Sequence, residues 1–327
     1  MDESSALRAA SLNPRALELI LFPTEACNFR CTYCYEKFEH GKMPRKVIEG
    51  VKSLIRSRQS NLDHLMLSWF GGEPLAAFPV IQEISTASIE YFGKSRLDGT
   101  ITTNGYLLSK DKALELLSFG VRLFHISLDG LEQNHNETRR LANGGPTFDR
   151  IWENLLALKS IEQDFTLNLR VHYSARNFDL VGALVHRLNE SFADDPRVKV
   201  YFTSINQLGG ANDKLFPRLT TEEKKKIEAD LNQDLHPSLR RPSNANFGSH
   251  YVCYAALGNS LGIRSDGSIV KCTVALDSPA NNIGFLREDG TLSVVQERFR
   301  KWIGSTLSGD FKQASCPAKA VLTQATT

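Results

Sequence analysis

Residues 17–34 read LELILFPTEACNFRCTYC, an apolar run followed by three cysteines in one short loop. The run LELILFP (17–23) is rich in strand-forming residues and predicts a buried β-strand. Directly after it, Cys27, Cys31 and Cys34 supply three thiolates with C-x3-C-x2-C spacing, which differs from the ferredoxin run. A cubane [4Fe–4S] cluster usually takes four cysteine ligands, so a set of three leaves one iron able to bind a substrate or cofactor.

Two other interpretations of this cysteine loop stay open. Zinc takes four closed ligands, and His40 is the candidate for the fourth, although it lies beyond the loop in a glycine-containing stretch. Inert buried cysteines are the second alternative. Spacing and context favour an iron–sulfur cluster over both.

Strand-like and helix-like segments alternate along most of the chain. The predicted strands are 17–23, 65–70, 100–103, 121–128, 165–174 and 198–205. The predicted helices are 44–58, 78–93, 109–120, 148–161, 178–191 and 220–235, the last with a capping box of Thr220 and Glu223. Six strand–helix units predict parallel strands with right-handed crossovers. Six units are too few for the closed eight-unit barrel, so we expect an α/β fold with a partial (β/α)6 TIM-like barrel.

Polar or glycine-rich motifs follow the predicted strands. CNFRCTYC follows the first strand, GGEP (71–74) the second, TTNG (102–105) the third and SLDG (127–130) the fourth. In parallel β/α folds, chemistry gathers at the carboxyl ends of the strands. The four motifs are therefore expected to meet in one site.

CNFRCTYC after a first barrel strand resembles the signature of the radical S-adenosylmethionine superfamily, and the later motifs follow in the expected order. The resemblance implies that Cys27, Cys31 and Cys34 hold a [4Fe–4S] cluster whose open iron binds S-adenosylmethionine. Reductive cleavage of that cofactor gives a 5′-deoxyadenosyl radical that abstracts a substrate hydrogen, so the protein is expected to be an enzyme. Fold and cofactor are shared by many chemistries, so they do not specify the reaction.

The same resemblance implies the residues that contact S-adenosylmethionine. They are Tyr33, Gly71, Gly72, Glu73, Pro74, Thr103, Asn104, Ser127, Asp129 and Arg139. Glu73 would accept a hydrogen bond from the methionine amino group, with a tight turn as the alternative reading of its motif. Arg139 would bind the methionine carboxylate, and because Arg140 is adjacent the assignment can shift by one. Tyr33 would pack beside adenine, whereas His125 and His135 are expected to be structural.

The other three cysteines fall in the last quarter of the chain. Cys253-x13-Gly267-x4-Cys272 resembles the element of SPASM and twitch domains that binds auxiliary iron–sulfur clusters, and Cys316 follows 44 positions later. The next ligand usual in that element is missing, because Lys319 stands three positions after Cys316. We therefore expect one auxiliary [4Fe–4S] cluster with three cysteine ligands. Ordinary thiols, or a degenerate and empty site, are the alternatives.

Domain organisation follows from these patterns. We expect an N-terminal extension (1–16), a radical SAM partial barrel (17–235), a linker (236–250) and a small α+β auxiliary-cluster domain (251–327). The last domain would contain a hairpin over 261–276 that turns at Asp266–Gly267.

Composition limits the functional classes. The 327 residues carry 39 basic and 37 acidic side chains, and this near balance argues against nucleic-acid binding by bulk charge. No uncharged apolar run approaches the ~20 residues of a membrane helix, and the first fifteen residues lack the apolar core of a signal peptide. Six cysteines in two groups do not resemble a disulfide scaffold, so the expected compartment is the cytoplasm.

The resemblance favours a peptide maturase that installs a C–C, C–O or thioether crosslink in a ribosomally made precursor peptide. The implied partners are that peptide and a flavodoxin- or ferredoxin-type electron donor. A separate peptide-recognition protein is an optional third partner. The alternatives are a sulfatase-maturating, formylglycine-forming enzyme and a small-molecule dehydrogenase. A non-enzymatic iron–sulfur scaffold leaves GGEP and SLDG without a purpose. Candidates for a catalytic base are His250, Tyr251, Asp213 and Glu36.

Overall fold

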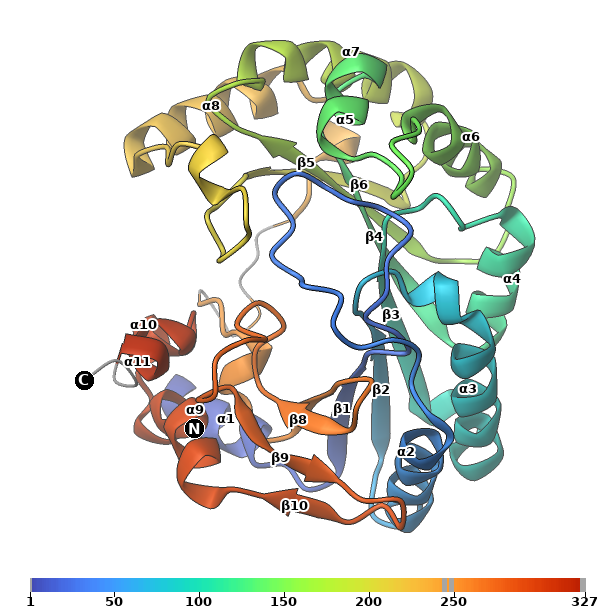
Figure 1. The fold of residues 1–327 in the computed structure, drawn as a ribbon, viewed down its shortest axis with the longest axis vertical. Helices are drawn as coiled ribbons and strands as arrows, with labels where there is room; N and C mark the ends of the chain where they lie inside the picture. The colour runs from blue at the N-terminus through green and yellow to red at the C-terminus, as the bar shows by residue number, and fades with distance from the viewer. Residues whose placement is uncertain (1, 243–245, 247–249, 324–327) are drawn as a thin grey trace.

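The computed structural model describes residues 2–242, 246 and 250–323. Six parallel strands curve into an open ring with their crossover helices on its outer side (Figure 1). The strands are β1 (Ala16–Leu21), β2 (His64–Trp69), β3 (Leu97–Thr103), β4 (Val121–Leu128), β5 (Thr166–Tyr173) and β6 (Val198–Ser204). The helices after them are α2 (Arg45–Ser57), α3 (Phe78–Phe92), α4 (Lys110–Ser118), α6 (Phe148–Leu158), α7 (Phe178–Phe192) and α8 (Thr221–Asp234). The predicted α/β partial barrel is confirmed.

The structure also contains short elements that the sequence analysis did not predict. They are α5 (Glu132–Thr138) and the 3-10 turns η1 (Pro74–Ala77), η2 (Lys94–Arg96), η3 (Asp213–Leu215), η4 (Pro237–Leu239) and η5 (Tyr254–Ala256). Helix α5 has the sequence EQNHNET, which lacks any apolar periodicity, so no helical pattern could reveal it. Strand β3 begins at Leu97, three residues earlier than predicted. The prediction missed this start because Asp98 and Gly99 are poor strand formers.

The C-terminal strands continue the barrel sheet. Its order is β10-β9-β8-β7-β1-β2-β3-β4-β5-β6, and β7 (Ser260–Ile263) pairs in parallel with β1. The predicted hairpin is confirmed, because β8 (Ser268–Val270) runs antiparallel to β7 and the turn between them contains Gly267 at φ 93°. Strands β9 (Asn282–Leu286) and β10 (Leu292–Val294) then extend the sheet, followed by α9 (Gln296–Ser308), α10 (Phe311–Ala314) and α11 (Ala318–Thr323).

The first helix, α1 (Glu3–Ser11), packs against this C-terminal part. Leu7 is fully buried in a small cluster with Val252, Ala256 and Ala314. The predicted extension is thus a structural part of the far end of the chain. The predicted linker 236–250 contains η4, and its residues 243–245 and 247–249 lie outside the described residues.

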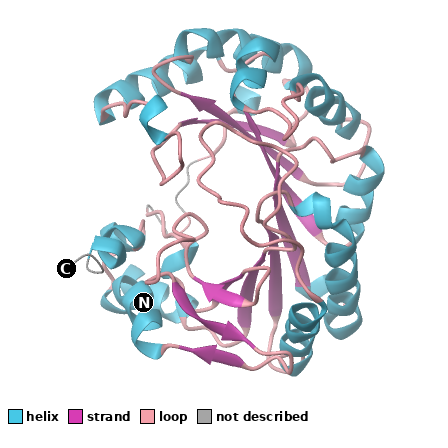
Figure 2. Ribbon diagram, in the orientation of Figure 1, coloured by secondary structure: helices cyan, strands magenta, loops and turns pink. Residues whose placement is uncertain are grey.

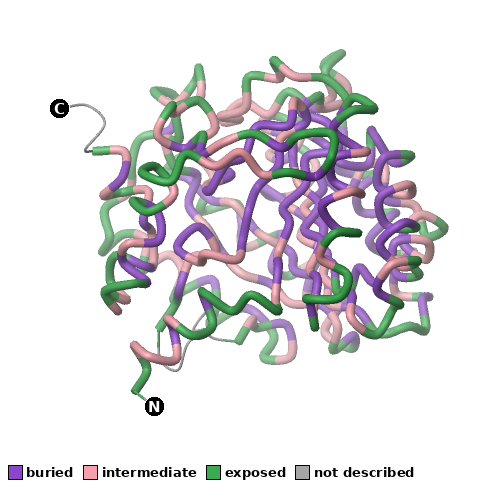
Figure 3. Tube along the Cα trace, turned by 90° about the horizontal axis from the view of Figure 1, so that it is seen from below, coloured by how far each residue is buried: buried purple, intermediate pink, exposed green. Residues whose placement is uncertain are grey.

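The core follows the strands and the inner faces of their helices. Buried backbone, purple in Figure 3, concentrates along the sheet, while the outer turns of the helices are exposed. Loops at the carboxyl ends of the strands cross the inside of the ring (Figure 2). In the part of the chain that the structure describes, no helix is long and apolar enough to cross a membrane.

The capping box of α8 provides a test of the local stability argument. The Thr220 hydroxyl accepts from the Glu223 amide at 3.2 Å, and the Glu223 carboxylate accepts from the Thr220 amide at 2.7 Å. Thr220→Ala removes the first bond and should lower the free energy of unfolding by roughly 1 kcal/mol in urea titration. Thr221→Ala, at the next and exposed position, is the matched control and should change it by less than about 0.5 kcal/mol.

Candidate active site

A pocket of about 250 Å³ lies at the carboxyl ends of the barrel strands. The long loop between β1 and α2, medium blue in Figure 1, folds back inside the ring and forms one wall. Cys27, Cys31 and Cys34 all line this pocket. The predicted residues that line it with them are Tyr33, Gly71, Gly72, Thr103, Asn104, Ser127 and Arg139. Four motifs far apart in the sequence therefore do meet in one place.

The three cysteines of the loop form no disulfide and are half-buried. Burial raises the pKa of Cys27 to about 12 and that of Cys34 to about 12, and the neighbouring thiols add to both shifts. Buried thiols are poor anions without a compensating cation, and metal coordination deprotonates a thiol outright. Among the described residues, no three His, Cys, Asp or Glu side chains are grouped to hold one metal ion. A multi-iron cluster differs from a single ion because its irons lie at separate corners, so each cysteine binds a different iron and the thiols need not surround one point.

Gly71 and Gly72 hold the second strand end against the backbone of the cysteine loop. A Cβ on Gly71 would lie 2.3 Å from the Thr24 carbonyl oxygen, and one on Gly72 would lie 2.6 Å from that of Ala26. Gly71 also has φ 114°, a conformation that other residues rarely adopt. The sequence analysis predicts that these glycines contact S-adenosylmethionine. The structure shows that they are first required for a backbone-to-backbone contact within the protein.

Glu73 is completely buried and joins the second and third strand ends. Its carboxylate accepts from the Leu75 amide at 3.0 Å, from the Thr103 hydroxyl at 2.7 Å and from the Asn104 amide at 2.7 Å. Burial raises the pKa of Glu73 against the opposing effect of these bonds. Neither Glu73 nor Pro74 is part of the pocket lining in the described residues. The expected contact between Glu73 and a cofactor amine stays a prediction.

A buried polar network ties the SLDG motif to the cysteine loop. Asp129 Oδ1 accepts from the Tyr33 hydroxyl at 2.9 Å and lies 3.1 Å from His172 Nδ1, while Oδ2 accepts from the Thr138 hydroxyl at 2.7 Å. Burial would raise the pKa of Asp129, but the His172 hydrogen bond and the Arg139 charge hold it well below its usual range. Asp129 is therefore an anion beneath the pocket wall, where it positions other side chains.

Arg139 is the cation of this network. It is buried, and its NH1 donates to the Tyr33 hydroxyl at 2.8 Å. Its Nε has no hydrogen-bond partner among the described residues, although Arg139 lines the pocket. An unpartnered guanidinium donor beside the three thiols fits a carboxylate-bearing ligand. The described residues thus fit the cluster and cofactor that the motifs imply.

Two histidines lie near the site: His135 stabilises a turn, and His125 has an unpartnered ring nitrogen among the described residues. His135 Nδ1 accepts from the Asp129 amide at 3.3 Å and so holds the SLDG turn. Burial lowers its pKa to about 3, so the ring is neutral near pH 7. His125 Nδ1 is buried without a partner in the described chain.

The four candidate bases are scattered. Glu36 lines the pocket, and burial, followed by the charge of Glu25, raises its pKa to about 8. Asp213 lies in a surface turn, where it accepts from the Gly209 amide at 2.8 Å. His250 and Tyr251 are exposed and outside the described pocket lining.

The pocket also contains residues that the sequence analysis did not single out. They are the cysteine-loop residues Phe29, Tyr35 and Phe38, the strand residues Thr102, Arg170, His172, Thr203 and Ser204, and the residues after β6, Ile205, Asn206 and Leu208. The strand-end rule was applied to the first four strands only. Extended to β5 and β6, it would have identified His172 and Ser204. Nothing local in the sequence distinguishes Phe38 or Leu208.

The second cysteine set belongs to separate elements of the C-terminal part. Cys253 precedes η5, Cys272 follows β8 and Cys316 lies between α10 and α11. Burial, with added effects of Cys272 and Cys316, raises the pKa of Cys253 to about 11. The three thiols are therefore close enough to affect one another. None of them lines the main pocket in the described chain.

Several contacts join the cysteine loop to the C-terminal hairpin, among them the following two. The Tyr35 hydroxyl, next to Cys34, donates to the Thr273 carbonyl, next to Cys272, at 3.1 Å. Arg264 donates to both carboxylate oxygens of buried Glu25, at 3.1 and 2.5 Å. The pocket and the second cysteine set are therefore adjacent across Tyr35.

One family model and several known proteins are similar to this chain. Residues 21–172 match the family model described as Radical SAM superfamily. The chain is 26% identical over 263 residues to GTP 3′,8-cyclase of Campylobacter jejuni subsp. doylei, covering 76% of this chain and 78% of the relative. It is 29% identical over 278 residues to GTP 3′,8-cyclase 3 of Mycobacterium tuberculosis, covering 79% and 71%.

Solved structures resemble the chain over nearly its whole length. The structure of anSMEcpe with bound AdoMet has a TM-score of 0.66 at 18% identity and covers 91% of this chain and 83% of its own. Streptococcus suis SuiB bound to precursor peptide SuiA has a TM-score of 0.61 at 16% identity, with coverage of 94% and 70%. At these identities the likeness concerns the fold.

The buried Asp129 network predicts a pH-dependent stability. Because the pKa of Asp129 is depressed by folding, its contribution is complete above the unfolded value of 3.8 and declines as pH falls below it. Asp129→Asn leaves Arg139 without its buried counter-charge and should lower the free energy of unfolding by about 3 kcal/mol near pH 7. The difference from the natural protein should shrink below pH 3.8 in urea titrations.

Asp149→Asn, at an exposed carboxyl on α6, is the control and should stay within about 0.5 kcal/mol of the natural protein. A difference for Asp129→Asn that stays constant down to about pH 2 would contradict the ionised state assigned to Asp129.

Proposed function

We propose that this enzyme of radical chemistry, whose residues 21–172 form a Radical SAM superfamily domain, modifies a precursor peptide. The observation that carries the cofactor assignment is the convergence of Cys27, Cys31 and Cys34 with the Arg139 guanidinium in one pocket. The cysteines would hold a [4Fe–4S] cluster, and the Arg139 guanidinium, which lines the pocket, would bind the cofactor carboxylate. Bound there, the cluster and S-adenosylmethionine supply a carbon-centred radical that removes hydrogen from an unactivated position.

The chain's own residues orient and shield this chemistry. Phe29, Tyr35 and Phe38 give the pocket an apolar wall, which limits contact with water and competing proton or hydrogen donors. Arg139 is fixed by its bond to Tyr33, and Tyr33 is fixed in turn by Asp129. Binding energy spent on such preorganisation favours a single orientation of the ligand.

An auxiliary cluster is part of the proposal. Cys253, Cys272 and Cys316 would supply a SPASM- or twitch-like site with three cysteine ligands, and the effect of the other two thiols on the pKa of Cys253 supports this assignment. Its place across Tyr35 from the pocket is suited to receiving the electron left after hydrogen abstraction, or to binding a substrate atom. We assign the domains as first predicted, with the barrel over 17–235 and the auxiliary part over 251–327.

A peptide substrate is supported by the pocket rim and by the fold. Leu208 lines the pocket and is 42% exposed, and Leu215 in the same β6–α8 connection is 45% exposed. Exposed apolar side chains at a pocket mouth fit the side chains of an extended peptide. SuiB, which shares the fold over 94% of this chain, was solved with a precursor peptide. A flavodoxin- or ferredoxin-type protein would supply the electron, and a separate recognition protein would present the peptide if the barrel alone does not bind it.

A nucleotide cyclase is the second candidate. The sequence relatives that cover about three-quarters of this chain are named GTP 3′,8-cyclases. Arg170 reaches the pocket and would suit a phosphate group.

Iron content tests the two-cluster assignment. Anaerobically reconstituted natural protein should bind about eight irons per chain, and the triple variant C253A/C272A/C316A about four. The variant C27A/C31A/C34A should also keep about four irons but lose S-adenosylmethionine binding in equilibrium dialysis. A natural protein with only about four irons, unchanged in C253A/C272A/C316A, would remove the auxiliary cluster from the proposal.

Product analysis tests the substrate. With S-adenosylmethionine and a reductant, a short precursor peptide encoded beside the gene should lose about two hydrogens by mass spectrometry as 5′-deoxyadenosine forms. GTP should be recovered unchanged under the same conditions. Consumption of GTP coupled to 5′-deoxyadenosine, with the peptide unmodified, would replace the peptide assignment by the cyclase.

A further inference from the structure

Two arginines converge on one tyrosine inside the ring, next to the pocket. Arg170 on β5 donates from Nε to the Tyr201 hydroxyl on β6 at 2.6 Å. The guanidinium carbon of Arg170 lies 5.6 Å from the centre of the Tyr201 ring, and that of Arg241 lies 4.6 Å from it. We refer to Arg170, Tyr201 and Arg241 as the arginine cluster.

The arginine cluster has no negative partner within the described chain. Neither guanidinium has a carboxylate within 4.0 Å among the described residues, and the Arg241 side chain makes no hydrogen bond to them. Each guanidinium carries five N–H donors, of which Arg170 uses one. The cluster therefore has a surplus of oriented donors as well as of positive charge.

The charges of both arginines affect the pKa of His125 on β4. Burial lowers its pKa to about 4, and the charges of Arg170 and Arg241 lower it further in the same direction. The ring is therefore neutral near pH 7, and its buried Nδ1 has no partner in the described chain. His125 Nδ1 and the two guanidiniums therefore have hydrogen-bonding capacity that the described residues do not use and that an anionic group could satisfy.

Packing alone does not account for this arrangement. A tyrosine ring stabilises a nearby cation by about 0.5–2 kcal/mol, but the like charges of two half-buried arginines that lie over one ring repel each other. An anion placed among them would relieve that repulsion and accept charge-assisted hydrogen bonds, which planar guanidinium groups donate in pairs.

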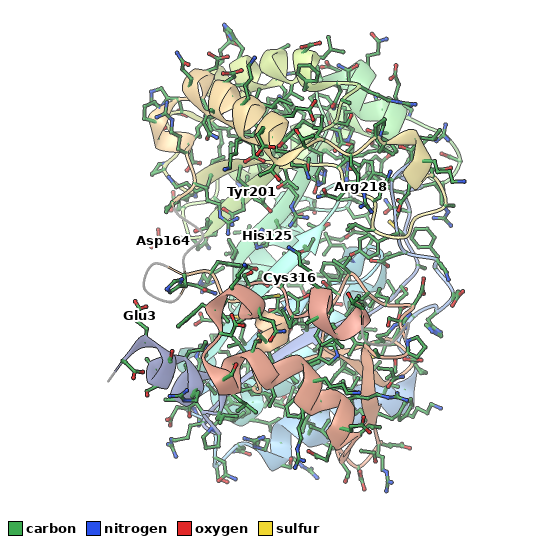
Figure 4. The ribbon with its side chains drawn as sticks, turned by 90° about the vertical axis from the view of Figure 1, so that its left-hand side faces the viewer. Glu3, His125, Asp164, Tyr201, Arg218 and Cys316 are labelled. Carbon is green, nitrogen blue, oxygen red and sulfur yellow. The ribbon has the colours of Figure 1, made fainter. Side chains whose placement is uncertain are left out.

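The cluster is placed to act on a substrate. Arg170 pairs in register with Ser127 on one side and Tyr201 on the other, so it stands level with a predicted cofactor residue. Arg170 lines the pocket, whereas Tyr201, Arg241 and His125 lie beyond its described lining. Seen from the open side of the ring, Tyr201 and His125 lie above Cys316 (Figure 4).

We propose that the arginine cluster binds an anionic oxygen group of the substrate, a carboxylate or a phosphate, and so orients the substrate between the pocket and the second cysteine set. That the bound anion belongs to the substrate rests on the proposed function. The anion site itself can be tested without turnover. A carboxylate would come from a peptide and a phosphate from a nucleotide.

Arginine-selective labelling with 2,3-butanedione tests the site in the reconstituted protein. Acetate and inorganic phosphate serve as the two anionic probes, at equal ionic strength against chloride. Mass spectrometry of the digested protein gives the labelling rate of each arginine. We expect one or both probes to slow labelling of Arg170 and Arg241 at least threefold, with Arg218, an exposed arginine outside the cluster, unaffected.

Variants separate a shared site from two independent arginines. Arg170→Gln should abolish the protection of Arg241, and Arg241→Gln that of Arg170, whereas Arg218→Gln should leave both protected. Arg170→Lys, which keeps the charge but not the planar fork, should retain part of the protection. Circular dichroism confirms that each variant is folded.

Each outcome has a fixed meaning. Protection by acetate alone supports the site with a carboxylate source, protection by phosphate alone supports it with a phosphate source, and protection by both probes supports a site that accepts either anionic group. Equal labelling with and without the probes overturns the proposal. Failure of the reagent to reach either arginine also overturns it, because a place closed to a small dicarbonyl is closed to a substrate. Formation of 5′-deoxyadenosine without anion protection would reject this site and leave the proposed function standing.

Discussion

Close backbone contact between the cysteine loop and Gly71–Gly72 is the constraint on which the site depends. A side chain at either glycine would meet a carbonyl oxygen of residues 24–26 at 2.3–2.6 Å. The same contact is held by hydrogen bonds from the Gly72 amide to Thr24 and from the Glu73 amide to Ala26, at 3.3 and 3.0 Å. The loop can therefore reach back into the ring only because this stretch of the second strand end has no side chains.

From that contact the order of the site propagates strand by strand. Glu73 is carried into the core directly after the glycines, where its carboxylate fixes Thr103 and Asn104 at the end of β3. On the far side of the loop, Tyr33 meets Asp129 after β4 and His172 on β5. Each carboxylate is buried and accepts several hydrogen bonds, which offsets the cost of removing its charge from water.

Charge is distributed unevenly within the ring. The buried carboxyl groups of Glu73 and Asp129 lie behind the pocket wall, whereas Arg139 and the arginine cluster present guanidinium groups on the inner side. An anionic cofactor group and an anionic substrate group would each find an unpaired donor there. The C-terminal part closes on the same region, because Glu25 binds Arg264 and Tyr35 binds Thr273 across it.

The sequence by itself determined the six strand–helix units and the three N-terminal thiolates, because strand and helix periods and cysteine spacing are local properties. It also placed the hairpin at Asp266–Gly267, where turn chemistry is local. It could not show that β7 joins β1 in parallel, that α1 packs beside Ala314, or that Asp129 faces inward as a positioning anion.

Those features join residues up to hundreds of positions apart, and nothing in a local pattern encodes such pairing. The tertiary structure alone decided which candidates share the pocket, bringing Glu36 to it and leaving His250 and Asp213 outside its described lining. It alone brought Arg170 and Arg241 to one tyrosine, because their approach depends on how β5, β6 and the segment after η4 lie together.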